Sequence, residues 1–279
     1  MFSEPILYET HLHPPLCKHA KGEPEEYAAV AEQRGLKGII VTCHNPTNNG
    51  WAPQVRMSLD QFDDYIAMVE RARQAWAGRV DVRLGLESDY APGMESWLEK
   101  LHGLADFHHI LGSVHAPLPD YKDRYLNGDI VAFQRLYFEH LAMAAESGLF
   151  DTLAHPDLVK NVAPSEWKLE RVLDDIRRAL DRIAVTGVAM ELNTSGLNKA
   201  IREMNPGRTI LAEMQRRHIP VVVGADAHEP GRVAANFGDA LDLLQDVGYR
   251  HVNIFLNRQR HEIDIEAPRQ SLLTERVLA

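Results

Sequence analysis

The sequence contains little cysteine, with Cys17 and Cys43 the only two among 279 residues. Two cysteines do not build the disulfide framework that stabilises small extracellular domains. The sequence also lacks any run of roughly 20 apolar residues, the length that spans a bilayer. Residues 1–4 carry no basic segment and lead into no long apolar run, so we expect no signal peptide. These absences predict a cytoplasmic protein with no membrane partner.

An excess of positive charge is also missing, because 30 Lys and Arg stand against 40 Asp and Glu, giving a formal net charge of -10. This balance disfavours binding of a nucleic-acid backbone by surface charge. It leaves a small anionic substrate possible, because bound cations reverse the sign of the local field. No linker, repeat or low-complexity segment divides the chain, so we expect one domain over residues 1–279. The oligomeric state stays open, with a homo-oligomer as one option.

Apolar runs followed by amphipathic helical patterns recur along the whole chain. This alternation predicts a parallel sheet with right-handed crossovers, and seven or eight unbroken units predict a closed (β/α) barrel. After an opening strand that ends at Pro14, the expected strands cover residues 36–44, 82–90, 107–115, 150–156, 187–193, 219–228 and 251–256. The expected helices cover residues 24–35, 58–76, 94–104, 129–148, 165–186, 206–217 and 234–246.

Histidines and carboxylates stand where these strands end. His11 and His13 alternate in the first strand and therefore project from one face, which suits two imidazoles that bind one cation. Asp226 and His228 repeat this spacing in the seventh strand. In barrels of this kind, the carboxyl ends of the strands meet at one mouth, where the reacting groups lie. The side chains expected there are His11, His13, His19, His44, Glu87, His115, His155, Asp226 and His228.

Nine such side chains exceed what one ion needs. At three or four protein ligands per catalytic ion, they suit two or three cations, and Glu87 is the carboxylate we expect to bridge two of them. Cys17 and Cys43 lie near this set and are interpreted as small buried fillers, with soft metal ligands as the alternative. The remaining histidines fall on helices, strand starts or the tail and are interpreted as surface or packing residues: His102, His108, His109, His140, His218, His251 and His261.

Taken in order, these residues resemble a known superfamily. The motifs are His11-x-His13, His19, His44, Glu87, Gly112-Ser113-Val114-His115, His155-Pro156 and Gly224-Ala225-Asp226-Ala227-His228. This set is similar to the PHP (polymerase and histidinol phosphatase) superfamily and resembles its monofunctional histidinol-phosphate phosphatases over essentially the whole chain. The stretches that begin at Pro15, Gly85 and Asn193 resemble the same branch. One departure is Cys43, which precedes His44 where an acidic residue is frequent in the family.

The resemblance implies a (β/α)7 distorted TIM-like barrel with three divalent metal ions, which would be zinc, iron or manganese. Carried over residue by residue, one ion would use His11, His13, Glu87 and Asp226. A second would use Glu87, His115 and His155, and the third His19, His44 and His228. The identity of the metals stays open, because imidazole and carboxylate accept all three.

The resemblance also implies hydrolysis of a small phosphate monoester, with L-histidinol phosphate giving L-histidinol and phosphate in histidine biosynthesis. A hydroxide bridging two ions would attack phosphorus, so no serine or cysteine nucleophile is required. We assign no general acid. The residues expected to act in catalysis are His11, His13, Glu87, His115, His155 and Asp226.

Phosphate also requires cationic or amide donors beyond the metals. The expected substrate-binding residues are Arg56, Lys160, Asn193 and Arg202, which fall at strand ends or in the following loops. If the substrate is histidinol phosphate, its ammonium and imidazole require acidic or aromatic neighbours, for which the candidates are Asp89, Tyr90 and Trp51.

Two other functions compete with this one. A PHP-type exonuclease or nucleotide phosphoesterase would use the same metals on a nucleotide, and it predicts a basic groove with stacking aromatics, which the sequence does not display. A non-catalytic metal-binding protein with the same fold predicts missing ligands, whereas all nine are present. Phosphate release from histidinol phosphate, compared with cleavage of single-stranded DNA, separates the two enzymes.

Overall fold

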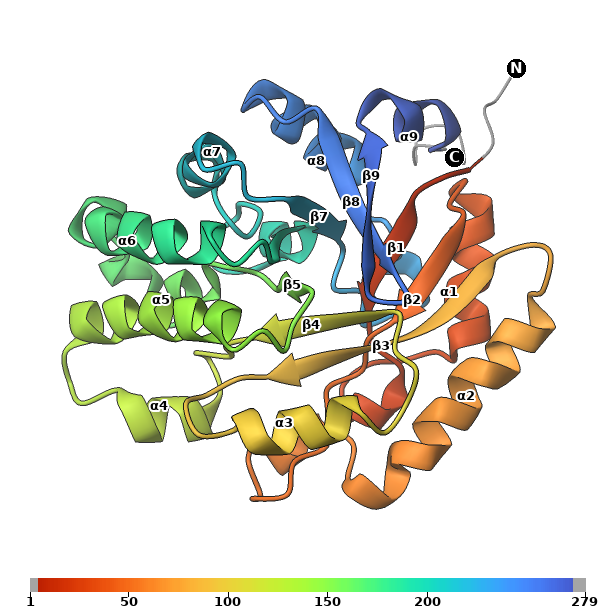
Figure 1. Cartoon of the computed structure of the whole chain (residues 1–279), viewed down its shortest axis with the longest axis horizontal. Helices are drawn as coiled ribbons and strands as arrows, with labels where there is room; N and C mark the ends of the chain where they lie inside the picture. The colour runs from red at the N-terminus through yellow and green to blue at the C-terminus, as the bar shows by residue number, and fades with distance from the viewer. Residues whose placement is uncertain (1–4, 273–279) are drawn as a thin grey trace.

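Seven parallel strands form the centre of the computed structural model, which describes residues 5–272 (Figure 1). They pair in the order of the sequence from β1 to β7. Two backbone hydrogen bonds join the first strand to the segment after the last strand: His13 N donates to Ala227 O (2.9 Å), and Ala227 N donates to His11 O (3.0 Å). The sheet therefore curves into a nearly closed barrel, which confirms the predicted fold class. The strands are β1 Tyr8–Leu12, β2 Gly38–Val41, β3 Asp81–Asp89, β4 His109–Ser113, β5 Thr152–Leu153, β6 Ala189–Asn193 and β7 Val221–Gly224.

Helices follow the strands and lie around the outside of the barrel (Figure 1). Capping residues in the sequence determine where these helices start. Helix α1 begins with Pro24, and the side chains of Glu23 and Glu26 each accept a hydrogen bond from the other's backbone amide. At the start of α5, the Asp129 carboxylate accepts hydrogen bonds from two backbone amides of the helix. The helices are α1 Pro24–Gln33, α2 Phe62–Ala75, α3 Glu95–His102, α4 Pro119–Tyr125, α5 Ile130–Glu146, α6 Leu173–Ala184, α7 Arg208–Arg216, α8 Phe237–Asp246 and α9 Glu266–Ser271.

A hairpin of β8 (His251–Leu256) and β9 (Gln259–Asp264) lies apart from the barrel sheet. The strand expected at residues 251–256 is therefore present, but it pairs antiparallel with β9 and adds no unit to the barrel. The Phe255 ring stacks on His109 at the start of β4, with ring centroids 5.1 Å apart, and packs with Ala189 and Val222. The hairpin thus covers the amino-terminal end of the barrel and leaves the opposite end accessible to ligands.

The clearest differences from the sequence prediction are a late helix start, an additional helix and a short strand. The helix expected from residue 165 begins only at Leu173, because residues 164–171 form two short 3-10 turns. Helix α4, which Pro119 opens, was not expected, and β5 contains two residues only. Residues 1–4, where no signal peptide is expected, lie outside the described residues. None of the helices within residues 5–272 has the length and apolarity required to span a membrane.

Candidate metal centre

The nine predicted ligands meet at the carboxyl end of the barrel, although they come from six strands and the loops that follow. Glu87 lies in their midst, near the end of β3. Its Oε1 atom is 3.4, 3.3 and 3.1 Å from the Nε2 atoms of His11, His115 and His155, and its Oε2 atom is 3.4 Å from His13 Nε2 and 2.7 Å from His44 Nδ1. Five imidazoles therefore surround one carboxylate.

The remaining ligands extend this cluster to one side. Asp226 Oδ1 lies 3.3 Å from His13 Nε2 and 3.7 Å from His11 Nε2. The ring of His228 stacks between those of His13 and His19, with centroid separations of 4.2 and 4.6 Å. The structure thus brings all nine side chains into one continuous group.

Many of the ring and carboxylate atoms in this group are buried and make no hydrogen bond of good geometry within the protein, although they lie close to one another. They include His11 Nε2, His13 Nε2, His44 Nδ1, His228 Nε2 and Glu87 Oε2. Burying polar atoms without partners costs free energy, so native proteins rarely leave several together. Ligand atoms from His11, His13 and Asp226 lie within 4.8 Å of one another, as do those from His44, Glu87 and His115. The donor set and its geometry therefore fit divalent metal ions.

Burial and charge keep two imidazoles neutral and two carboxylates ionised. Burial lowers the pKa of both His13 and His44 to about 3, so their rings hold a free lone pair at neutral pH. For Glu87 and Asp226, burial alone would raise the pKa, but the surrounding imidazoles outweigh it and hold both values well below the usual range. Neutral imidazole and ionised carboxylate are the states that bind metal.

Glu191 on β6 is a residue of this site that the sequence analysis missed. Its Oε1 atom lies 2.7 Å from His11 Nδ1, while its Oε2 atom accepts hydrogen bonds from the backbone amide of His155 (2.8 Å) and from Asn193 Nδ2 (3.0 Å). A carboxylate on Nδ1 places the proton there and leaves Nε2 available to a metal. Gly224 makes room for it, because a Cβ there would lie 2.2 Å from Glu191 Oε1. The sequence feature that could have identified Glu191 is that it is a single acidic residue within the apolar run 188–192.

Asp89 plays the corresponding role for His115. Its Oδ1 atom lies 2.7 Å from His115 Nδ1, and its Oδ2 atom accepts hydrogen bonds from Arg56 Nη2 and from Trp51 Nε1 (3.0 Å). Three residues that the sequence analysis offered as separate substrate contacts are thus partners in one network. Arg56 also donates to the carbonyl oxygens of Ala52 and Asn45 and is 2% exposed. It lines the cavity described below, but its donors are largely used within the protein.

The other predicted substrate contacts lie away from that cavity. Lys160 is fully buried, and its ammonium donates to Asp157, Glu203 and the carbonyl oxygen of Met204. Asn193 is also buried and hydrogen-bonds to Glu191 and Ser195. Arg202 is exposed in the loop between β6 and α7. Sequence position could not separate these environments, because all three residues lie at a strand end or in the loop that follows one. The Tyr90 hydroxyl donates to Glu95.

A cavity of about 370 Å³ opens above the cluster. Lys199 lies in its wall, with Nζ 3.0 Å from Ser195 Oγ and 4.0 Å from Asp226 Oδ2, and this cation was missed by the sequence analysis. The lining is His19, His44, Val55, Arg56, His115, Pro117, Leu118, His155, Leu158, Asn161, Lys199, Asp226 and His228. The cavity therefore joins candidate metal ligands, two cations and an apolar wall.

Two of the nine residues have strained backbones. His155 and Asp226 adopt φ of 30° and 50°, a region that residues other than glycine seldom occupy. Such conformations persist where surrounding contacts hold them, and they concentrate at functional sites. The hydrogen bond from His155 N to Glu191 supplies one such contact.

The cysteines lie beside the group rather than within it. Both Cys17 and Cys43 are free and buried. The Cys17 sulfur, His19 and His228 nevertheless offer ligand atoms within 4.8 Å of one another, so the soft-ligand alternative stays open for Cys17. Of the other histidines, His109 and His140 are buried and hydrogen-bond to Thr152 and Tyr121, as packing residues do.

Comparison with known proteins agrees with this geometry. A model of the PHP domain matches residues 9–195. A probable histidinol-phosphatase of Deinococcus radiodurans is 39% identical over 252 residues, covering 88% of this chain and 95% of its own. The histidinol-phosphatase of Bacillus subtilis is 23% identical over 252 residues, covering 80% and 94%.

A solved structure shares the fold. The histidinol phosphate phosphatase of Lactococcus lactis, crystallised with zinc, L-histidinol and phosphate, superposes with a TM-score of 0.77 at 18% identity, covering 91% of this chain and 98% of its own. The matched residues 9–195 contain seven of the nine clustered side chains, and Asp226 and His228 join them from the segment after β7. The chain therefore belongs to the PHP domain family.

Proposed function

We propose that the protein is a metal-dependent phosphatase that hydrolyses L-histidinol phosphate to L-histidinol and phosphate, a step of histidine biosynthesis. The observation that carries this proposal is the convergence of seven imidazoles and two carboxylates at the floor of the 370 Å³ cavity. The choice of substrate is supported by the 39% identity to the Deinococcus radiodurans relative, which is named a probable histidinol-phosphatase.

The proposal includes three divalent ions, with zinc, iron and manganese as candidates. His11, His13, Glu87 and Asp226 would hold one, and Glu87 with His115 and His155 a second. His19, His44 and His228 would hold the third, since ligand atoms of His228 lie within 4.8 Å of those of His44 and of His19. The zinc named with the Lactococcus structure supports a zinc-loaded form.

When bound, such ions polarise phosphoryl oxygens and lower the pKa of water toward neutrality. The protein's own residues supply positioning. Glu191 and Asp89 each hold a ligand histidine by Nδ1, so that Nε2 of His11 and of His115 faces Glu87. Glu87 is 1% exposed, so bulk water does not screen its charge.

Lys199 is the group that we propose binds the phosphate of the substrate. Its ammonium is at the cavity wall, 28% exposed, and next to the clustered ligands. A charge-assisted hydrogen bond from lysine to a phosphoryl oxygen is short and strong. The apolar lining at Val55, Pro117 and Leu118 offers a surface for the imidazole ring of histidinol.

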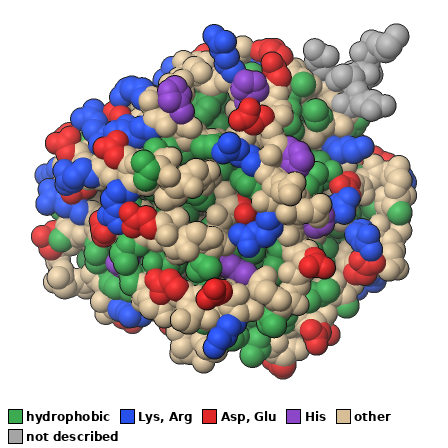
Figure 2. All heavy atoms as spheres, in the orientation of Figure 1, with side chains coloured by type: hydrophobic (Ala, Val, Ile, Leu, Met, Phe, Trp, Pro, Cys, Tyr) green, Lys and Arg blue, Asp and Glu red, His purple; other side chains and the backbone are tan. Residues whose placement is uncertain are grey.

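The cavity and the charge do not favour a nuclease. A volume of about 370 Å³ holds a small phosphomonoester, whereas a chain of nucleotides needs a long cationic groove with stacking aromatics. Figure 2 shows acidic and basic side chains interspersed over one face of the molecule, with no continuous basic stripe there. Net charge of -10 acts against a polyanion in the same way.

A substrate panel tests the proposal. Metal-loaded protein is assayed for phosphate release from L-histidinol phosphate, other small phosphomonoesters and a mononucleotide, and for cleavage of single-stranded DNA. We expect the highest kcat/KM with L-histidinol phosphate. Preference for another monoester would replace the substrate while keeping the reaction class, and cleavage of DNA without monoester turnover would replace both.

A further inference from the structure

A second cavity, of about 310 Å³, lies at the start of β3, on the amino-terminal side of the barrel. Its lining comes from the start of β2, the end of α2, the turn after that helix and the first residues of β3: Lys37, Arg73, Ala77, Gly78, Arg79, Val80, Asp81, Val82 and Arg83. Glu87 follows Asp81 by six residues on the same extended strand, so the two sites are roughly 20 Å apart at ~3.3 Å per residue. The cavity is therefore separate from the metal centre.

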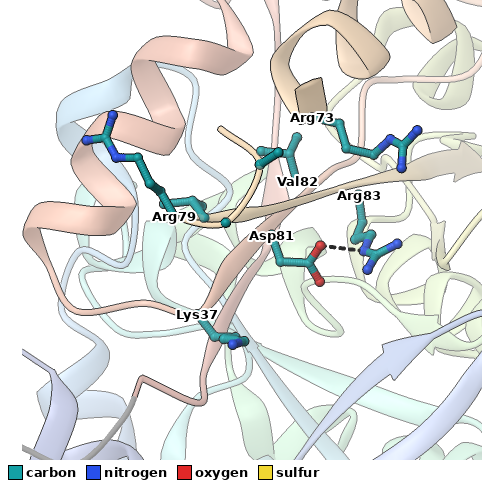
Figure 3. Close-up of a pocket in the computed structure, with 9 residues that line it drawn as sticks. Lys37, Arg73, Arg79, Asp81, Val82 and Arg83 are labelled. Atoms are coloured by element: carbon teal, nitrogen blue, oxygen red, sulfur yellow. Dashed lines mark ion pairs between the residues drawn. The ribbon is translucent and has the colours of Figure 1, made fainter. Parts of the chain in front are cut away.

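Four of its nine lining residues are cationic and one is acidic, in a chain that is acidic overall. Figure 3 shows the side chain of Arg79 directed away from those of Arg73 and Arg83. Arg79 pairs with Glu32 and lies over the Trp76 ring. Apart from Arg79, the cations of the lining are Lys37, Arg73 and Arg83.

These three cations keep donors available. Arg73 uses Nε and Nη2 on Glu70, which leaves Nη1, and Arg83 uses Nε on Asp81, which leaves both Nη atoms. Within residues 5–272, Lys37 Nζ has neither a hydrogen-bond nor an ion-pair partner. Asp81 is the only acid in the lining, and its charge is shared between Arg83 and the Tyr8 hydroxyl, 2.5 Å away. Since Glu70 pairs with Arg73 and Asp81 with Arg83, the three cations carry an excess of one positive charge, and all three keep unused donors.

We propose that this cavity binds a small ligand that carries adjacent phosphate groups. Guanidinium groups match phosphate oxygens with two parallel hydrogen bonds, and a lysine adds a point charge. One phosphate occupies only a small part of 310 Å³, and this volume is at the lower end of the range of ligand cavities. The ammonium of Lys37 and the unused Nη atoms of Arg73 and Arg83 can donate to oxygens of two adjacent phosphates, which a diphosphate supplies.

Calorimetry with inorganic pyrophosphate tests the proposal on metal-loaded protein. The variant Lys37→Glu/Arg73→Glu reverses two cavity charges at exposed positions, so we expect it to fold and to bind pyrophosphate at least about tenfold more weakly. The matched control Lys100→Glu/Lys168→Glu makes the same change in net charge at two exposed lysines outside the cavity and should bind like the wild type.

Pyrophosphate can also bind the metals, so the titration is repeated in a Glu87→Gln background, where binding at the second cavity should persist. The proposal is overturned if Lys37→Glu/Arg73→Glu binds like the wild type, or if Glu87→Gln abolishes all binding.

A parallel titration with ADP identifies the source of the phosphates. Tighter binding of ADP than of pyrophosphate assigns the site to a nucleotide, and equal or weaker binding assigns it to the bare diphosphate group.

Discussion

Glu191 Oε1 lies 2.7 Å from His11 Nδ1, and both side chains are fully buried. The other oxygen of this carboxylate accepts from His155 N, so one side chain orients the imidazole of one proposed metal ligand on β1 and the strained backbone of a second proposed ligand after β5. A buried carboxylate on Nδ1 fixes the tautomer and raises the basicity of the ligand nitrogen. Glu191 is therefore a positioning residue, and its loss should weaken metal binding.

Replacing this carboxylate by an amide should weaken metal binding. In Glu191→Gln, an amide nitrogen must face either His11 Nδ1 or the donors His155 N and Asn193 Nδ2. We expect the affinity for Zn²⁺ to fall by about 10–100-fold, measured by competition with a chelator. The exposed Glu99→Gln serves as the control. Unchanged affinity in Glu191→Gln would show that the carboxylate does not position His11.

Breaking the buried Asp89–Arg56 ion pair should strongly destabilise the protein. The two side chains are 3% and 2% exposed, and Asp89 is held ionised because Arg56 and His115 outweigh the effect of burial on its pKa. Removing one partner of a buried pair typically costs about 3–5 kcal/mol. Urea unfolding of Asp89→Asn should reveal a loss of this order, against less than about 0.5 kcal/mol for the exposed Asp123→Asn. Equal losses in the two variants would refute the assignment.

The sequence predicted the strand-end residues well because they obey a rule of topology. In a parallel barrel every strand delivers its carboxyl end to one mouth, so His44, Glu87 and His115 could be grouped without coordinates. The same rule failed for Lys160, since it places a residue near the mouth without saying whether its ammonium faces the cavity or buried acceptors. Glu191 and Lys199 were missed for a related reason. Their roles depend on which side chains of other strands they contact.

Lys199 and Arg202 are two cations of one loop, but only Lys199 lines the cavity above the proposed metal ligands. Arg202 is therefore a matched control for the role of Lys199. A hydrogen bond to a charged group is worth about 1.5–3 kcal/mol, so Lys199→Ala should raise KM for L-histidinol phosphate at least about tenfold. Arg202→Ala should leave steady-state kinetics unchanged. If Arg202→Ala impairs KM more than Lys199→Ala does, the assignment of the phosphate-binding cation is reversed.

The metal-free protein should lose stability as the solution is acidified. Burial lowers the folded-state pKa of His13 and His44 from 6.5 to about 3, so the unfolded chain binds more protons between these values and stability rises with pH across this window. Urea midpoints measured from pH 4 to pH 6.5 should therefore increase. His44→Gln removes one of these titrations and should flatten the slope. A slope unaffected by His44→Gln would contradict the buried neutral imidazole.

His115 should act in the opposite direction at alkaline pH. Although burial lowers its pKa, Asp89 and Glu87 outweigh burial and raise the pKa to about 10. The folded protein therefore holds an extra proton between pH 6.5 and 10, and this contribution to stability is lost as pH rises through that range. The urea midpoint of the metal-free protein should fall more from pH 7 to pH 9.5 than that of His115→Gln. Equal falls would contradict the raised pKa.

The dependence of phosphate release on bound metal tests the central claim most directly. The protein is stripped with a chelator, and its rate of phosphate release from L-histidinol phosphate is followed while Zn²⁺, Fe²⁺ or Mn²⁺ is added back. We predict no turnover without metal and a rate that rises until more than one ion is bound per chain. Undiminished turnover by the stripped protein, or none with any of the three metals, would contradict the account.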